Sequence, residues 1–292
     1  MEEMKIRKIS KRSLPNAASE PWVDATRRVY CEGEYAFVPV KEGYPFDGEI
    51  PDRRPYSGPG YQRMGDTLLL HGDAPTADEL AALIAWEKPS CVIHAATHEG
   101  VMRTPKASVL FGQPHDVTFR EAGITYTLDP SKVMFSQGNR GEKLRLRSLV
   151  KPGERIADMF AGIGYFTLSA ALAGGNVHAV EINPVSFAYL EKNIEANDLA
   201  GRVTPELGDC RERLFGIYDR ILMGHFEAPD FLKTALDHAE PGTVLHVHGV
   251  GDRKNDITET LEGAGFTYII SEHKVKKYAG RLWHSVWDVN LI

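Results

Sequence analysis

Cysteine is scarce in this sequence, and long apolar runs are missing. Among its 292 residues, Cys31, Cys91 and Cys210 lie far apart and form no Cys-x-x-Cys pair. We therefore expect neither a disulfide framework nor a metal site, and the cytoplasm fits this cysteine usage. No uninterrupted apolar segment is long enough to span a bilayer, and the charged first twelve residues lack a signal-peptide core. We expect no membrane contact.

An excess of positive charge is also missing. The formal net charge is −6, which argues mildly against a nucleic-acid-binding protein. Three basic runs nevertheless occur, at residues 5–12, 140–151 and 274–281. Each run is by itself best explained as a solvated face, but together they could track the phosphates of a nucleic acid. Hydrophobic residues make up 42% of the chain, which is ordinary for a globular protein long enough for two domains.

The apolar pattern changes near residue 120. Four segments before that point resemble short strands: 35–40, 67–71, 91–94 and 109–111. One helix is expected to begin at Thr76, with Glu79 completing a capping box. The Pro- and Gly-rich residues 41–62 are expected to form a long irregular loop. We therefore predict a smaller N-terminal α+β domain over residues 1–120.

After residue 120, strands and helices are expected to alternate. Strands are predicted at 124–129, 155–159, 177–181, 202–206, 219–223 and 243–248, with a closing strand pair at 267–270 and 285–291. Helices are predicted at 142–149, 165–173, 184–196, 229–238 and 253–263. This alternation is typical of a parallel sheet covered on both faces. It predicts an α/β domain over residues 121–292.

The stretch from Ile156 to Tyr165, IADMFAGIGY, carries the strongest functional signal. An apolar run ends at Asp158, and a turn with Gly162 and Gly164 leads into a helical pattern. Open α/β sheets build nucleotide pockets from such a strand, glycine turn and helix. About twenty residues later Glu181 ends a second apolar run, at the spacing where a carboxylate meets a ribose diol.

A third acid, Asp209, follows the next predicted strand and could accept a hydrogen bond from the amine of adenine. Each acid alone is better explained as a helix cap or a solvated carboxylate. Three in order at strand ends predict an adenosine-containing ligand. The turn lacks the third glycine expected for a dinucleotide and resembles the S-adenosylmethionine pocket of class I methyltransferases. The resemblance implies a Rossmann-like domain of that class.

The predicted site residues fall into two groups. The cofactor-binding group consists of Ser136, Asn139, Phe160, Gly162, Glu181, Asn183, Asp209, Cys210 and Met223. The catalytic group consists of Arg103, Glu142 and His225. After the fourth strand, Met223-Gly224-His225 stands where amino methyltransferases carry an Asn-Pro-Pro motif. His225 is either a general base or a surface or capping histidine.

Five motifs together resemble the archaeal and eukaryotic enzymes that modify position 37 of tRNA. They are DPSKVMFSQGN from Asp129, DMFAGIG from Asp158, EINP from Glu181, Asn193-Ile-x-x-Asn197, and Val275-Lys-x-Tyr278. The family comprises guanine-N1 methyltransferases and their paralogues in the wybutosine pathway, the 3-amino-3-carboxypropyl transferases. The resemblance covers about residues 85–292.

Two features favour the transferase branch. Methyltransferases usually carry an Asn-Leu-Pro-like motif where this chain has Met223-Gly224-His225, and Phe-x-x-Arg where it has Met134-Phe-Ser136-x-Gly-Asn139. A departure is Gly141-Glu142-Lys143, where the family has Glu-Arg. Methyltransferases also often have an extra N-terminal domain, for which this chain is expected to have no room.

The resemblance implies transfer of the aminocarboxypropyl group from S-adenosylmethionine to the C7 carbon of a tricyclic guanosine derivative, 4-demethylwyosine, in tRNA-Phe. Ser136 and Asn139 would orient the methionine arm, and Arg103 would contact the anticodon loop. The protein is expected to act as a monomer. Guanine-37 N1 methylation and a non-catalytic RNA-binding module remain alternatives.

Overall fold

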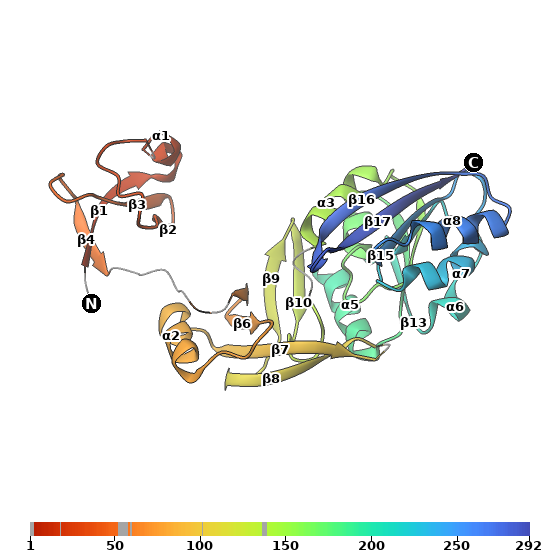
Figure 1. The fold of residues 1–292 in the computed structure, drawn as a ribbon, viewed down its shortest axis with the longest axis horizontal. Helices are drawn as coiled ribbons and strands as arrows, with labels where there is room; N and C mark the ends of the chain where they lie inside the picture. Colours follow the sequence, from red (N-terminus) through yellow and green to blue (C-terminus); the bar gives the residue numbers. More distant parts are fainter. Residues whose placement is uncertain (1–2, 18, 52–57, 59, 101, 136–138) are drawn as a thin grey trace. The chain divides into compact units, whose positions relative to one another are not determined.

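The computed structural model describes residues 3–17, 19–51, 58, 60–100, 102–135 and 139–292. The chain forms two compact units, one of Met1–Gly60 with Pro75–Lys88 and one of Tyr61–Ala74 with Pro89–Ile292 (Figure 1). The sequence analysis instead divides the chain at residue 120, according to the expected roles of the two parts. That division stays a prediction. None of the helices in the described residues has the length and hydropathy of a membrane span.

The first unit contains an antiparallel sheet of order β2-β3-β1-β4. Its elements are β1 (Glu3–Ser10), β2 (Tyr30–Glu32), β3 (Tyr35–Pro39), β4 (Gly48–Pro51), α1 (Leu14–Ala17) and α2 (Ala77–Glu87). The irregular loop predicted for 41–62 is wrong in part, because β4 lies within it and pairs with β1. A short edge strand needs backbone pairing on one side only, so a Gly- and Pro-rich segment can form it. The capping box of α2 is confirmed, with Thr76 Oγ1 and the Glu79 amide 3.3 Å apart.

The second unit begins with a four-stranded sheet and a hairpin. The sheet has the order β5-β6-β7-β8 and consists of β5 (Tyr61–Met64), β6 (Thr67–Leu70), β7 (Cys91–Glu99) and β8 (Thr104–Gly112). The hairpin joins β9 (Val117–Glu121) to β10 (Ile124–Leu128). β7 and β8 pair antiparallel, and the turn between them carries Arg103.

The remainder of the second unit is a seven-stranded sheet with flanking helices. Its strands are β11 (Arg155–Asp158), β12 (Asn176–Glu181), β13 (Val203–Leu207), β14 (Arg220–Met223), β15 (Val244–Val250), β16 (Tyr268–Ala279) and β17 (Leu282–Leu291). Its helices are α3 (Arg140–Leu149), α4 (Thr167–Leu172), α5 (Pro184–Ala196), α6 (Cys210–Arg213), the 3₁₀ segment η3 (Ala228–Phe231), α7 (Leu232–Leu236) and α8 (Lys254–Gly263). The predicted alternation and the closing strand pair are confirmed.

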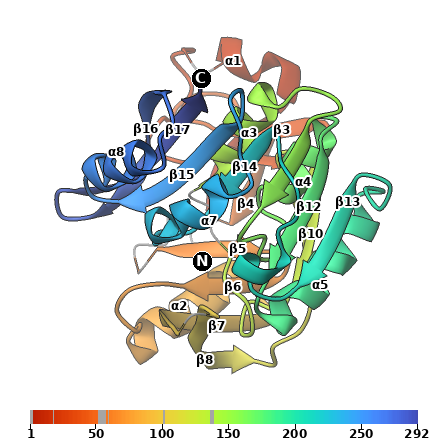
Figure 2. The same cartoon turned by 90° about the vertical axis from the view of Figure 1, so that its right-hand side faces the viewer.

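The strand order is β13-β12-β11-β14-β15-β17-β16, and β17 runs in the opposite direction to the other strands. From β11 the chain first moves to β12 on one side, and later β14 pairs with β11 on the other. Helices therefore cover both faces, as Figure 2 shows. Ile156 packs in the core beneath α4 and α5, whereas the next residue, Ala157, packs in the core beneath α7 and α8. The reversal beside β11 leaves a crevice at the carboxyl ends of the strands.

Candidate cofactor and acceptor site

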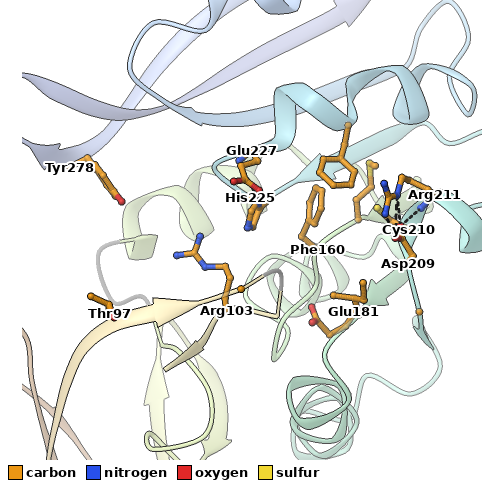
Figure 3. Close-up of a pocket in the computed structure, with 15 residues that line it drawn as sticks. Thr97, Arg103, Phe160, Glu181, Asp209, Cys210, Arg211, His225, Glu227 and Tyr278 are labelled. Atoms are coloured by element: carbon orange, nitrogen blue, oxygen red, sulfur yellow. Dashed lines mark hydrogen bonds and ion pairs between the residues drawn. The ribbon is translucent and has the colours of Figure 1, made fainter. Parts of the chain in front are cut away.

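A cavity of about 680 Å³ lies at those carboxyl ends (Figure 3). It is lined by Thr97, Gly100, Arg103, Met159, Phe160, Glu181, Ile182, Gly208, Asp209, Cys210, Arg211, His225, Glu227, Phe231 and Tyr278. Most of this lining comes from the ends of β11, β12, β13 and β14 and the residues that follow them, and the rest comes from η3, from β7 with the β7–β8 turn, and from β16. A volume of this size suits a nucleoside ligand.

Glu181 is fixed by backbone amides. Its Oε2 accepts from the Gly162 amide at 2.7 Å, and its Oε1 accepts from the Asn183 amide at 2.7 Å. Burial raises the pKa of this carboxyl group, while the amides of Asn183, Gly162 and Ile182 act in the opposite direction. The two oxygens of a carboxylate have about four acceptor positions between them, so acceptor capacity remains for a ligand. The side chain therefore presents two acceptors at a fixed place in the cavity, as a ribose diol requires.

The glycine turn has a packing reason as well as a functional one. Gly162 and Gly164 have φ angles of +57° and +101°, in the region that favours glycine. A Cβ on Gly162 would lie 2.8 Å from the ring of Tyr165, and one on Gly164 would lie 2.8 Å from Leu168 Cγ. Behind the turn, Asp158 accepts from the Thr167 hydroxyl at 2.7 Å. Burial raises the pKa of Asp158 to about 6.

Asp209 is engaged with its neighbour Arg211. It accepts from the Arg211 backbone amide at 2.9 Å and from Arg211 Nε at 3.0 Å. Hydrogen bonding to Arg211 is the main cause that lowers the pKa of Asp209. Cys210 is buried beside it, and burial raises the pKa of its thiol to about 12. Asp209 is thus a helix cap that lines the cavity, and reading of adenine by this residue stays a prediction.

His225 lies against Phe160, with 5.3 Å between the ring centroids. Its Nδ1 accepts from the Glu227 amide at 3.2 Å, so the proton of the neutral ring belongs on Nε2. Burial, and next the charge of Arg103, lower the pKa of His225. In this state His225 offers a hydrogen-bond donor, and it caps the turn that follows β14. This geometry agrees with the capping interpretation and leaves the general-base role untested.

Arg103 joins the cavity from the β7–β8 turn. Its guanidinium lies over the ring of Phe226, 5.2 Å from the centroid, and Nη2 lies 3.7 Å from Met134 Sδ. Its Nε is buried and has no hydrogen-bond partner. Asn183 holds this turn, because its side-chain amide donates to the Met102 carbonyl at 3.0 Å. Asn183 also caps α5. It thereby acts as a brace between the cofactor strand and the turn that carries Arg103.

The structure brings six predicted residues to the cavity: Arg103, Phe160, Glu181, Asp209, Cys210 and His225. Gly162 and Asn183 contact Glu181 from behind. Met223 is fully buried in the core and does not line the cavity. Asn139 begins α3 without capping it, and its Oδ1 is buried without a partner. Ser136 lies outside the described residues.

Glu142 points into a buried ion-pair network and does not line the cavity. It accepts from Arg145 Nε at 2.8 Å, and Arg145 Nη2 in turn donates to Asp288 at 3.1 Å. Asp288 also contacts His246 Nδ1 at 2.6 Å. This network ties α3 to β15 and β17. The position of Glu142 therefore supports a structural role, and its catalytic role stays a prediction without structural support.

Sequence reasoning missed several lining residues. Thr97, Ile182, Phe231 and Tyr278 were not among the predicted site residues, although all four line the cavity. Tyr278 ends the Val275-Lys-x-Tyr278 motif, which was a usable signal. Ile182 directly follows Glu181, where class I pockets place an apolar contact. No sequence signal marks Thr97 and Phe231 as site residues, because their approach to the cavity depends on how β7 and η3 pack.

Comparison with known proteins gives consistent matches. A sequence model described as the TRM5/TYW2 methyltransferase domain matches residues 117–275. The tRNA(Phe) (4-demethylwyosine(37)-C(7)) aminocarboxypropyltransferase of Methanocaldococcus jannaschii is 32% identical over 241 residues, which are 78% of this chain and 96% of that protein. The crystal structure of Pyrococcus horikoshii TYW2 in complex with MeSAdo superimposes with a TM-score of 0.69 and 29% identity, over 80% of this chain and 90% of that one.

The crystal structure of Pyrococcus abyssi Trm5b is also similar. It superimposes with a TM-score of 0.73 and 25% identity, over 100% of this chain and 99% of that one. The match includes the first unit with its own four-stranded sheet. The expectation that the chain has no room for an extra N-terminal domain is therefore wrong. The reason is that β1, β2 and β4 carry no clear strand signal in the sequence, so these residues were not expected to form a separate folded unit.

Proposed function

Because the chain belongs to the family of TRM5/TYW2 methyltransferase domains, we propose that it transfers the 3-amino-3-carboxypropyl group of S-adenosylmethionine to tRNA. The proposed acceptor is the C7 carbon of 4-demethylwyosine at position 37 of tRNA-Phe. The observation that carries this proposal is the 32% identity to an enzyme named for that reaction, over 96% of its length. The by-product is 5′-methylthioadenosine.

The residues present fit S-adenosylmethionine. Glu181 offers two fixed acceptors for the ribose, and Phe160 and Phe231, which pack edge to face with ring centroids 5.2 Å apart, provide an aromatic surface. When bound, this group donor supplies a sulfonium with three electrophilic carbons. In the reaction, C7 forms a bond to the γ-carbon of the arm and the γ-carbon–sulfur bond breaks. Its electron pair stays on sulfur, and C7 loses its hydrogen as a proton.

The chain's own part is orientation. A sulfonium needs no further activation, so the product depends on which carbon the protein aims at the nucleophile. Glu181 and the glycine turn hold the nucleoside. His225 and Arg103 border the cavity on the side where we propose that the acceptor enters, and the carboxylate of Glu227 lies beside them. The choice of reaction therefore depends on how these residues direct the arm.

The first unit supports a contact with tRNA. Cations lie over aromatic rings on its sheet: Lys5 over Phe46 at 5.1 Å, Arg7 over Trp22 at 4.5 Å, and Lys8 over Tyr35 at 4.1 Å. Tyr35 and Phe46 are exposed. Interleaved cations and aromatic rings suit phosphates and unstacked bases. We propose that residues 1–120 contact tRNA while residues 121–292 bind the nucleoside of the group donor and carry out the transfer at the anticodon loop, as a monomer.

Guanine-37 N1 methylation is the second candidate. The full-length match to Trm5b, including the first unit, favours it. Two isotopically labelled forms of S-adenosylmethionine, incubated with tRNA-Phe that carries the tricyclic precursor, separate the candidates. Label on the carboxyl carbon should enter the tRNA, and label on the methyl group should leave in 5′-methylthioadenosine. The opposite distribution would establish methylation, and no turnover of either label would point to a binding module.

A further inference from the structure

The two arginines that line the cavity are in opposite situations. Arg211 donates from Nε to both oxygens of Asp209, at 3.0 and 3.1 Å, and its side chain is 61% exposed. Among the described residues, Arg103 has no carboxylate partner and its Nε has no hydrogen-bond partner. A thioether and an aromatic face are its neighbours. A guanidinium with a desolvated donor is incomplete without an anion.

The backbone around Arg103 is arranged to hold that side chain in place. Arg103 has a φ of +49°, a conformation that costs a non-glycine residue free energy. Its amide donates to the Gly100 carbonyl at 3.1 Å, which closes the turn. The brace from Asn183 to the Met102 carbonyl then ties the turn to the strand that ends at Glu181. A strained residue that is fixed to the cofactor strand points to a role in the site.

We propose that Arg103 binds the carboxylate of the aminocarboxypropyl group and thereby selects which carbon of the sulfonium faces the acceptor. This inference rests on the proposed function. The carboxylate belongs to the group that is transferred, so its pairing with Arg103 can persist while the γ-carbon moves from sulfur to C7. The planar guanidinium fork matches a carboxylate in a bidentate manner. With the carboxylate held at Arg103, the γ-carbon and not the methyl carbon is directed towards the acceptor side.

The alternative anion is a phosphate of the RNA backbone, and the site's geometry favours the carboxylate. The unpaired Nε is buried within the cavity that Glu181 also lines, whereas RNA phosphates remain at the protein surface. Burial lowers the pKa of His225, and the charge of Arg103 lowers it further, so the guanidinium lies close to another residue that lines the cavity.

The test compares two ligands that differ by this one carboxylate. Affinities of S-adenosylmethionine and decarboxylated S-adenosylmethionine are measured by calorimetry for the wild-type protein, R103Q and the matched control R211Q. We expect the wild type to prefer the carboxylated ligand by about tenfold or more, as for a charge-assisted hydrogen bond pair. R103Q should reduce that preference to within about threefold. R211Q removes the same charge from the same cavity, so it should keep the wild-type preference even if both affinities change.

An R103Q protein that keeps the full preference would overturn the inference, and a simultaneous loss of tRNA affinity would assign Arg103 to an RNA phosphate. Binding of 5′-methylthioadenosine, which lacks the arm, shows that the variant's cavity is intact. If R103Q fails to bind it, R103M gives the decision, since it removes the charge and keeps an unbranched side chain. An unchanged preference in R103M overturns the inference, and a reduced one supports it. Label transfer by the wild type tests the proposed function separately.

Discussion

The two ends of the cavity are built by different means. We call the part around Glu181 and Asp209 the nucleoside end and the part around Arg103 and His225 the acceptor end, after their proposed roles. At the nucleoside end, backbone amides of Gly162 and Asn183 occupy one lone pair on each Glu181 oxygen, and Asp209 is paired with Arg211. At the acceptor end, side chains from distant segments provide the surface, and the Nε of Arg103 has no partner. At the nucleoside end, protein partners fix the position of the ligand-binding side chains before any ligand arrives. At the acceptor end, Nε of Arg103 is left for the ligand to satisfy.

This difference separates binding from choice of reaction. The adenosine part of S-adenosylmethionine is the same in methylation and in aminocarboxypropyl transfer. An end of the cavity that is fixed by backbone groups can therefore serve both reactions. The choice between them depends on how the arm is directed, which a few side chains at the acceptor end decide. Variants at the nucleoside end should therefore weaken all ligands in parallel. Variants at the acceptor end should change discrimination between ligands with little loss of nucleoside affinity.

The largest effect is expected where the nucleoside end is supported from behind. Asn193 is fully buried, accepts from the Thr127 amide at 2.7 Å and donates to the Ile163 carbonyl in the glycine turn at 3.0 Å. Asn193→Leu would leave both backbone groups unpaired, and we expect a loss of about 3 kcal/mol in the free energy of unfolding. Urea unfolding measures it. Lys192→Ala, next to it on the exposed side of α5, should change stability by less than about 0.5 kcal/mol, and equal losses in the two variants would contradict this account.

Glu181→Ala breaks the same end from within the cavity. The loss of a charge-assisted pair of hydrogen bonds should weaken S-adenosylmethionine by tens of fold, or roughly 2–3 kcal/mol. Because Glu181 is proposed to hold the ribose and not the arm, the affinity for 5′-methylthioadenosine should weaken by the same factor. Calorimetry with both ligands checks this. An unchanged affinity removes Glu181 from the site, and a loss confined to S-adenosylmethionine would place it at the arm.

Much of the nucleoside end could be predicted from the sequence because its signals are local. Glu181 and Asp209 end successive strands, and the glycine turn directly follows β11, so spacing alone places them at one sheet edge. What spacing could not reveal is that Asp209 is already paired with Arg211. The amide contacts of Glu181 were also invisible, since they depend on the left-handed conformation of Gly162.

The acceptor end was predicted less well because distant segments form it. Tyr278 comes from β16 and Thr97 from β7, and their approach depends on the register of strands far apart in the chain. Glu142 shows the same limit. An acid beside a loop and a helix start suggested chemistry, but its ion-pair network runs through Arg145 to Asp288, 143 residues further along the chain. No local sequence pattern predicts a partner at such a distance along the chain.

A buried histidine pair behind the acceptor end should make stability sensitive to acid. His248 Nδ1 and His284 Nε2 lie 2.9 Å apart, and His284 packs against Phe226. Burial lowers the pKa of His284 to about 4, from about 6.5 in the unfolded chain. The unfolded chain therefore takes up the proton first, and stability falls as the pH drops from about 6.5 towards 4.

His284→Phe should remove that loss. Between pH 7 and pH 5 the wild type should lose about 2 kcal/mol relative to this variant, as judged by urea unfolding at each pH. Asp158 titrates in the same range with the opposite sign, but it is present in both proteins and cancels in the difference. His273→Phe, at a half-exposed position, should follow the wild type. If the free energy of unfolding falls equally with pH in the wild type and in His284→Phe, the titration of His284 does not contribute to the acid sensitivity.

The smallest effect is expected for His225→Ala, and it tests whether the acceptor end holds a titrating base. The variant loses an aromatic contact with Phe160, so the KM for S-adenosylmethionine should rise about fivefold, for roughly 1 kcal/mol. Because Nδ1 of His225 accepts from the Glu227 amide, the ring presents a donor and should not take up the proton that C7 loses. The pH–rate profile between about 6.5 and 8 should therefore keep its shape in the variant. If kcat instead fell by about a hundredfold or more, with loss of the acidic limb, His225 would be a general base, and the acceptor end would be as complete before binding as the nucleoside end.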